Sequence, residues 1–150
     1  MAGTANDGAA TELALPSASD IAAYHELAVQ LSPGMPQLRA LHLLESAVAR
    51  VETALAYGAA ADAVDAAALL CCTIIKNHPF MDGNKRGGYS ALAVVLWANG
   101  LRLEAGDMEL FQRLFQIAET SGPWEEFAAW IRDRVEPDTT FIAPAPASPP

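Results

Sequence analysis

One short polar stretch, from Lys76 to Arg86, carries side chains that could perform chemistry together. His78 could accept a proton near neutral pH, because an imidazole titrates in that range. Asp82 could hold Mg²⁺, which usually binds one or two carboxylates together with phosphate oxygens. Lys85 and its neighbour Arg86 add positive charge. A base, a metal ligand and cations in one stretch are what phosphoryl or nucleotidyl transfer requires.

A turn between two helices would position these side chains. Pro79 disfavours helical backbone in the residue before it, so the first helix should end near Asn77 or His78. Gly83 permits a tight turn, and a second helix can begin around Asn84. The start of a helix presents free backbone N–H groups that attract phosphate. The residues predicted to hold phosphate are Gly83, Asn84, Lys85 and Arg86.

The segments on either side of this turn are apolar almost all round, over residues 64–75 and 91–98. Helices that are apolar on every face lie at the centre of a bundle rather than on its surface. We therefore predict an all-α fold, a helical bundle in which two central buried helices are joined by the active-site loop.

Local signals predict where other helices begin and end. Residues 17–20, Ser-Ala-Ser-Asp, are typical of a capped helix start. Gly58 and Gly100 each follow an apolar helical segment and are expected to be C-terminal caps. Asp107 is expected to cap a further helix, and Pro123 suits the first turn of the last one.

Composition predicts the limits of the domain. The chain has 150 residues, of which 52% are apolar and 18% charged, which suits one globular domain. Residues 1–16 are small and polar, and residues 137–150 are rich in Pro and Ala, so both are predicted to be disordered tails. Residues 17–136 form the predicted domain, in which residues 101–103 are a short link that can be extended.

Charge and hydropathy argue against several classes of protein. A formal net charge of −9 argues against a general nucleic-acid binder. No apolar run approaches the length of a membrane span, and the N-terminus lacks the pattern of a secretory signal. We therefore expect a cytoplasmic protein with no membrane partner. Cys71 and Cys72 are adjacent in an apolar helix, which favours neither a disulfide framework nor a zinc site.

Several residues are expected to be structural. Phe80 is expected to anchor the loop, and His25 and His42 to be ordinary residues flanking apolar helix faces. Gly87 and Gly88 weaken a helix by about 1 kcal/mol each relative to alanine. Close approach of a ligand or a partner helix would explain them, and so would a tolerant first turn. The tryptophans expected only to pack are Trp97, Trp124 and Trp130.

The polar stretch resembles the signature of the Fic/Doc (Fido) superfamily, roughly H-x-F-x-[DE]-[AG]-N-[KG]-R. The matching residues are His78, Phe80, Asp82, Gly83, Asn84, Lys85 and Arg86. The resemblance is closer to the Doc (death-on-curing) branch than to the AMP-transferring Fic branch. Fic enzymes usually carry Gly at the position of Lys85 and a second Arg at that of Tyr89. One departure is Gly87-Gly88, where Doc proteins often have Thr-Ala. The resemblance covers about residues 19–135, and the family often has a His near position 25, so a role for His25 stays open.

This resemblance implies a Doc-like toxin of a toxin–antitoxin module, which transfers phosphate from ATP to a threonine hydroxyl of elongation factor Tu. It implies that His78 takes the proton of that hydroxyl and that Asp82 holds Mg²⁺. The nucleotide phosphates would be held by Asn84, Lys85, Arg86 and the backbone near Gly83. It also implies a small antitoxin protein, whose disordered segment folds on the toxin.

Three other interpretations stay open at the level of sequence. The first is AMP transfer to a protein hydroxyl, as in Fic enzymes. The second is a non-catalytic binding module that keeps the loop for structure, and the third is a plain helical scaffold. Many Fic proteins also carry an inhibitory helix with the pattern [ST]-x-x-x-E-[GN]. Residues 121–126 approach this pattern, but Glu126 occupies the Gly/Asn position, so we expect no built-in inhibitor.

Overall fold

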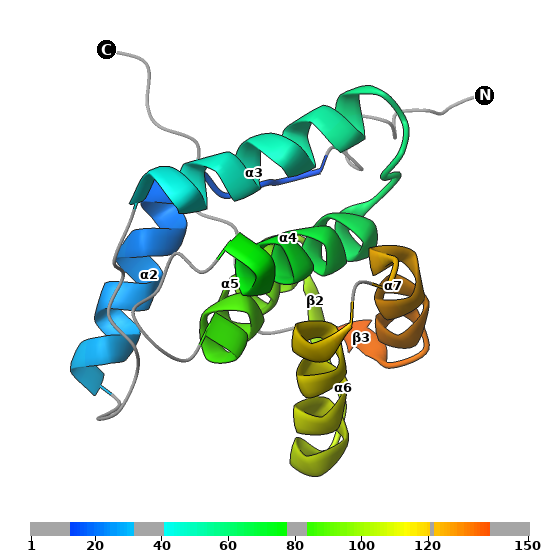
Figure 1. Cartoon of the computed structure of the whole chain (residues 1–150). Coiled ribbons are helices and arrows are strands. Elements are labelled where there is room, and N and C mark those ends of the chain that lie inside the picture. The colour runs from blue at the N-terminus through cyan, green and yellow to red at the C-terminus, as the bar shows by residue number, and fades with distance from the viewer. Residues whose placement is uncertain (1–12, 32–40, 78–83, 121, 139–150) are drawn as a thin grey trace.

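The computed structural model describes residues 13–31, 41–77, 84–120 and 122–138 (Figure 1). In chain order, the elements are α2 (Ala18–Leu31), α3 (Leu41–Ala56), α4 (Ala63–Asn77), α5 (Asn84–Ala98), β2 (Leu101–Leu103), α6 (Asp107–Glu119), α7 (Trp124–Arg132) and β3 (Val135–Pro137). The fold is thus helical, as predicted, with one small sheet of two strands. None of the helices in these ranges is long and apolar enough to cross a membrane.

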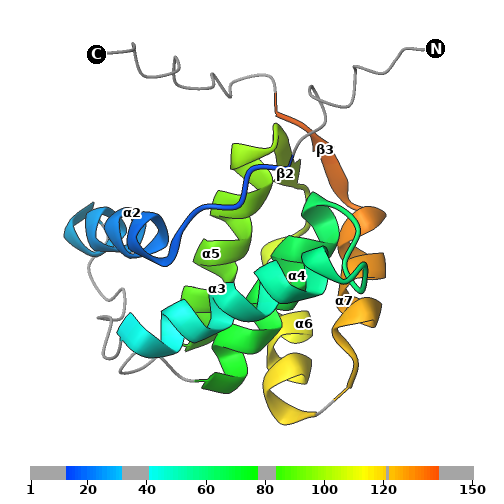
Figure 2. The same ribbon diagram turned by 90° about the horizontal axis from the view of Figure 1, so that it is seen from above.

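Helix α4 forms the centre of the bundle. Every residue from 66 to 75 is buried, as the all-round apolar sequence predicted. Helices α3, α5 and α7 all pack against it, and α2 and α7 lie on opposite sides of the α4–α5 pair (Figures 1 and 2). Helix α5 differs from α4, because its buried residues Ala91, Leu92, Val95 and Leu96 follow one face.

Three predicted helix ends are confirmed, because local hydrogen bonds set them. At the start of α2, the Ser17 hydroxyl accepts the Asp20 N–H at 3.0 Å, and the Asp20 carboxylate accepts the Ser17 N–H at 3.3 Å. This reciprocal pair satisfies donors that a helix start leaves free. Gly58 and Gly100 follow α3 and α5 with φ of 79° and 76°. Glycine adopts this left-handed conformation without steric penalty.

Two helix starts lie one residue away from their predicted positions. Gly106, in extended backbone, is the N-cap of α6, and Asp107 is the first helical residue. Asp107 therefore complements the helix dipole from within the first turn and does not act as the capping side chain. Similarly, Pro123 is the N-cap of α7, directly before the first turn that was predicted for it.

The two strands hold the end of the described chain against the end of α5. Strand β2 pairs antiparallel with β3, with Arg102 opposite Glu136. The Asp138 N–H donates to the Gly100 carbonyl at 2.8 Å. Residues before α2 reach the same end, because the Asn99 amide exchanges two hydrogen bonds with the Ala14 backbone, at 2.8 and 2.9 Å. Contacts of the folded unit therefore begin before residue 17 and continue past residue 136.

Candidate active site

The predicted active-site stretch, residues 78–86, leads from the C-terminal end of α4 into the first turn of α5. Helix α4 ends at Asn77 and α5 begins at Asn84, where the sequence predicted both ends. The predicted site residues between them, outside the described ranges, are His78, Phe80, Asp82 and Gly83. Their roles stay predictions. The structure describes the two helices that this stretch connects, α4 before it and α5 after it.

Gly88 allows these two helices to pack at short distance. A Cβ atom built on Gly88 would lie 3.0 Å from the carbonyl oxygen of Cys71 and 3.1 Å from Cγ1 of Ile75. Both atoms belong to α4, and a backbone carbonyl cannot move aside at low cost. Of the explanations considered for this glycine, the structure therefore supports close approach of a partner helix. Gly87 is also buried.

The last turn of α4 is fixed to its neighbour and carries one exposed cation. The Asn77 side-chain amide donates to the Leu43 carbonyl of α3 at 3.5 Å, a long and weak hydrogen bond. Lys76 lies beside it and is exposed, as expected of a cation that complements the C-terminal end of a helix dipole. The residue that enters the active-site stretch is thus positioned by both α3 and α4.

The first turn of α5 suits an anion. Asn84, Lys85 and Arg86 form this turn, which contains no acidic residue. Its backbone N–H groups have no partner within the helix, and the helix dipole places partial positive charge there. Such a turn is compatible with the phosphate site predicted at Gly83, Asn84, Lys85 and Arg86, which stays a prediction. The side chains of Asn84 and Arg86 lie outside what the structure describes.

Lys85 is a predicted phosphate-site residue, and the structure describes its side chain. It is half-buried, and its Nζ lies 5.5 Å from the ring centroid of Phe115 in α6. A cation over an aromatic face is stabilised by about 0.5–1 kcal/mol at an exposed site. Phe115 stacks in turn on Phe111, with ring centroids 6.3 Å apart. Phe115 of α6 therefore contacts the side chain of Lys85, which belongs to the first turn of α5.

His25 differs from its prediction. It was expected to flank an apolar face, but it is only 2% exposed and belongs to the interior side of α2. Helix α2 packs against both α3 and α5, which explains the burial. Its neighbour Tyr24 is 45% exposed. The ring of Tyr24 contacts Trp97 edge-on at 6.4 Å. His42 is exposed on α3, as expected of a flanking residue.

Comparison with protein families identifies this arrangement. The model described as Fic/DOC family matches residues 15–96, more than half of the chain. The chain belongs to the Fic/DOC family. The match includes the whole predicted active-site stretch and most of the four helices α2 to α5 that surround it. Members of the Fic/DOC family are typically transferases that modify proteins. Comparison with curated proteins gives no match.

The two cysteines of this Fic/DOC domain do not have the character of nucleophiles. Both are free and buried. Burial raises the pKa of Cys71 well above its usual value, and the neighbouring Cys72 raises it further. Burial raises the pKa of Cys72 to about 11, although Lys76 opposes the shift. Because the thiolate is the reactive form, both groups are inert thiols at neutral pH.

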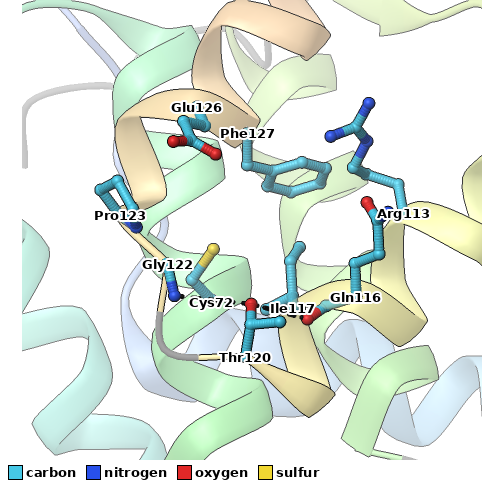
Figure 3. A pocket seen from close by; sticks show the side chains of 9 residues that line it. All are labelled: Cys72, Arg113, Gln116, Ile117, Thr120, Gly122, Pro123, Glu126 and Phe127. Atoms are coloured by element: carbon cyan, nitrogen blue, oxygen red, sulfur yellow. Dashed lines mark hydrogen bonds between the residues drawn. The ribbon is translucent and has the colours of Figure 1, made fainter.

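A cavity of about 320 Å³ opens beside α4, between α6 and α7 (Figure 3). Arg113 and Glu126 lie on its two sides, with the ring of Phe127 between them, and the Cys72 sulfur faces the hollow. Arg113 lies 5.4 Å from the centroid of the Trp130 ring. A protonated thiol and two opposite charges do not form a set for group transfer, so the active-site stretch is the better candidate.

Proposed function

We propose that this chain is a Doc-like toxin, a transferase that moves the γ-phosphate of ATP to a hydroxyl of a translation factor. Elongation factor Tu is the candidate acceptor, by resemblance to Doc proteins. The observation that carries the proposal is the position of the family motif. The motif ends in the first turn of α5, which is free of acidic residues. Helix α5 packs against the buried central helix α4.

The reaction assigns a step to each motif residue. His78 accepts the proton of the acceptor hydroxyl as its oxygen attacks the γ-phosphorus. The bond between that phosphorus and the bridging oxygen breaks, and ADP leaves. Backbone N–H groups at the start of α5, with Asn84, Lys85 and Arg86, hold the phosphates and stabilise charge in the transition state. When bound, Mg²⁺ would neutralise phosphate charge, and Asp82 is the residue that would hold it.

Position 89 favours phosphate transfer over AMP transfer. Fic enzymes usually have a second phosphate-binding arginine there, whereas this chain has Tyr89. Tyr89 packs against the core, and burial, together with the charge of Asp107, raises its pKa. It is therefore a neutral phenol at physiological pH and cannot supply the second cation. Lys85 likewise fills a position where Fic enzymes have glycine, which leaves less room for a Fic-like nucleotide pose.

Mass spectrometry tests this function. Purified chain is incubated with elongation factor Tu, ATP and Mg²⁺, and the acceptor is analysed intact and after digestion. We expect a gain of one phosphate on one hydroxyl residue, which disappears with His78→Ala. A gain of AMP would instead establish the Fic reaction. Absence of any nucleotide-dependent change, with tight binding to a partner retained, would favour a non-catalytic module.

A small antitoxin is the second partner that we propose, for a protein acting in the cytoplasm. Helix α6 presents three exposed apolar side chains, Met108, Phe111 and Phe115, and Phe115 contacts Lys85 of the motif. Such a surface suits an apolar segment that folds on binding. The expected result is that expression of the chain alone arrests growth, whereas co-expression with the antitoxin restores it.

A further inference from the structure

Two adjoining cavities form one groove between α3 and α7, across the buried helix α4. The inner cavity, of about 280 Å³, lies at the C-terminal end of α4 and is lined there by Lys76 and Asn77. The outer cavity, of about 490 Å³, runs along α3. Arg50, Leu69 and Trp124 line both cavities, so the two are continuous. We call them together the α3–α7 groove.

The inner cavity is positively charged in an acidic protein. Arg50 and Lys76 both line it, and no acidic residue lines either cavity of the groove. Neither cation takes part in a salt bridge within the described parts of the chain. Three other arginines at the opposite end of the fold, Arg102, Arg132 and Arg134, are all paired with carboxylates. The groove therefore keeps two cations available in a chain with net charge −9.

The outer cavity has a different chemistry. Its walls include the apolar side chains Ala49, Ala54 and Leu69 and the half-buried ring of Trp124. It suits an apolar side chain, whereas the inner cavity suits a negatively charged one. The inner cavity also lies next to the active-site stretch, because Lys76 and Asn77 directly precede His78.

We propose that the α3–α7 groove binds an extended acidic segment of the protein acceptor. An acidic side chain of that segment enters between Arg50 and Lys76, and an apolar side chain packs against Trp124. Binding in this register leads the segment toward the active-site stretch, where the acceptor hydroxyl reacts. This inference rests on the proposed transferase function and adds to it how the acceptor is recognised.

A nucleotide is the less suitable occupant. The carbonyl groups at the end of α4 carry partial negative charge, which opposes the several charges of a triphosphate more strongly than the single charge of a carboxylate. The free N–H groups at the start of α5 provide the better phosphate site. A single carboxylate paired with two cations fits the inner cavity.

Steady-state kinetics with elongation factor Tu and ATP test the proposal. The variants are Arg50→Gln, Lys76→Gln and the double variant, and Arg102→Gln is the matched control, since it removes one exposed cation at the opposite end of the fold. We expect the double variant to raise KM for the acceptor about ten- to hundredfold. The values of kcat and of KM for ATP should stay unchanged, because the lost contact is uniform binding energy.

Three outcomes would overturn the proposal. An unchanged acceptor KM in the double variant would show that the groove does not recognise the acceptor. A raised KM for ATP with an unchanged acceptor KM would assign the inner cavity to the nucleotide. A double variant that modifies the acceptor normally but escapes the antitoxin would assign the groove to the inhibitor.

A binding assay separates the groove from the proposed function. The probe is a fluorescein-labelled peptide with a leucine followed by two glutamates, compared by anisotropy with its twin in which glutamine replaces both glutamates. If the acidic peptide binds more tightly, and only to chains that retain Arg50 and Lys76, the groove is an acidic-segment site even if elongation factor Tu is not modified. Equal binding of the two peptides would refute the proposal that the groove binds an acidic segment, and would leave the proposed transferase function intact.

Discussion

Helices α4 and α6 have similar lengths but opposite relations to solvent. Helix α4 has eleven buried residues, whereas Leu114 is the single residue of α6 that is buried. Helix α6 instead exposes Met108, Phe111 and Phe115. The family match includes all of α4 and ends before α6 begins. The contrast indicates a buried centre that belongs to the matched family domain, next to a peripheral helix with an exposed apolar surface.

The first prediction concerns His78, which is expected to act in the reaction and not to stabilise the fold. His78→Ala should lower the transfer rate by about 10²–10⁴-fold, the usual contribution of a general base. The urea midpoint of unfolding should stay within error of the parent, because the packing of α4 and α5 is untouched. His42→Ala, on the exposed side of α3, is the control for both measurements. Full activity in His78→Ala would contradict the assigned base.

The second prediction tests the contrast in stability directly. Leu70 is fully buried in α4, so Leu70→Ala should lower the free energy of unfolding by about 2–5 kcal/mol. Met108 is 71% exposed on α6, so Met108→Ala should change that free energy by less than about 0.5 kcal/mol. Urea denaturation followed by circular dichroism gives both values. Similar losses in the two variants would show that α6 is as integral to the fold as α4.

The third prediction concerns the close packing of α4 and α5. Gly88→Ala gains about 1 kcal/mol of helix propensity, but the added methyl group overpacks against the Cys71 carbonyl, at a cost of about 1–3 kcal/mol. We expect a net loss of up to about 2 kcal/mol in thermal or urea unfolding. Gly106, the N-cap of α6, has open space around the same position, so Gly106→Ala is the control for a methyl group added without overpacking. A stabilised Gly88→Ala would show that the two helices can separate at little cost.

The fourth and smallest effect concerns the other end of α4, where α7 is attached. The Asp62 carboxylate accepts the Asp65 N–H at 3.0 Å and is paired with Arg132 of α7 at 2.7 Å. Asp62→Ala should cost about 1 kcal/mol, because it removes the helix cap. Asp62→Asn can keep the cap and loses the ion pair, which is worth less than about 1 kcal/mol at this exposure.

The same carboxylate gives a pH dependence of known sign. Burial alone would raise the pKa of Asp62, but hydrogen bonds from Arg132 and from the Asp65 backbone outweigh it and lower the pKa below 3.8. The ionised form therefore stabilises the fold above pH 3.8, and this contribution is lost as the pH falls through the lowered pKa. The difference in stability between parent and Asp62→Asn should accordingly shrink in acid. A difference that persists at low pH would contradict an ionic origin.

Sequence patterns predicted the architecture well where the cause is local. The all-round apolar run of α4 predicted its burial, and Gly58 and Gly100 predicted the ends of α3 and α5. Pairing of β2 with β3 could not be predicted from three-residue segments, because the partner strand is far away in sequence. The burial of His25 was also missed, because it depends on where α3 and α5 lie.

The candidate site could likewise be predicted from the sequence only in part. The motif from His78 to Arg86 predicted the chemistry, and the structure provides the end of α4 and the start of α5 around it. The contact of Lys85 with Phe115 could not be predicted, since the two residues lie on different helices. The α3–α7 groove was likewise absent from the sequence analysis, because Arg50, Lys76 and Trp124 come from three helices.

The sequence by itself determined which segments become helices, which helix lies at the centre and which short stretch resembles the family's signature. These properties follow from hydrophobic periodicity and from hydrogen bonds between residues a few positions apart. Tertiary structure alone decided that Gly88 packs closely against α4, that His25 is buried and that Arg50 and Lys76 line one cavity. The physical reason is that each of these depends on the distance between helices, which no single segment of the chain specifies.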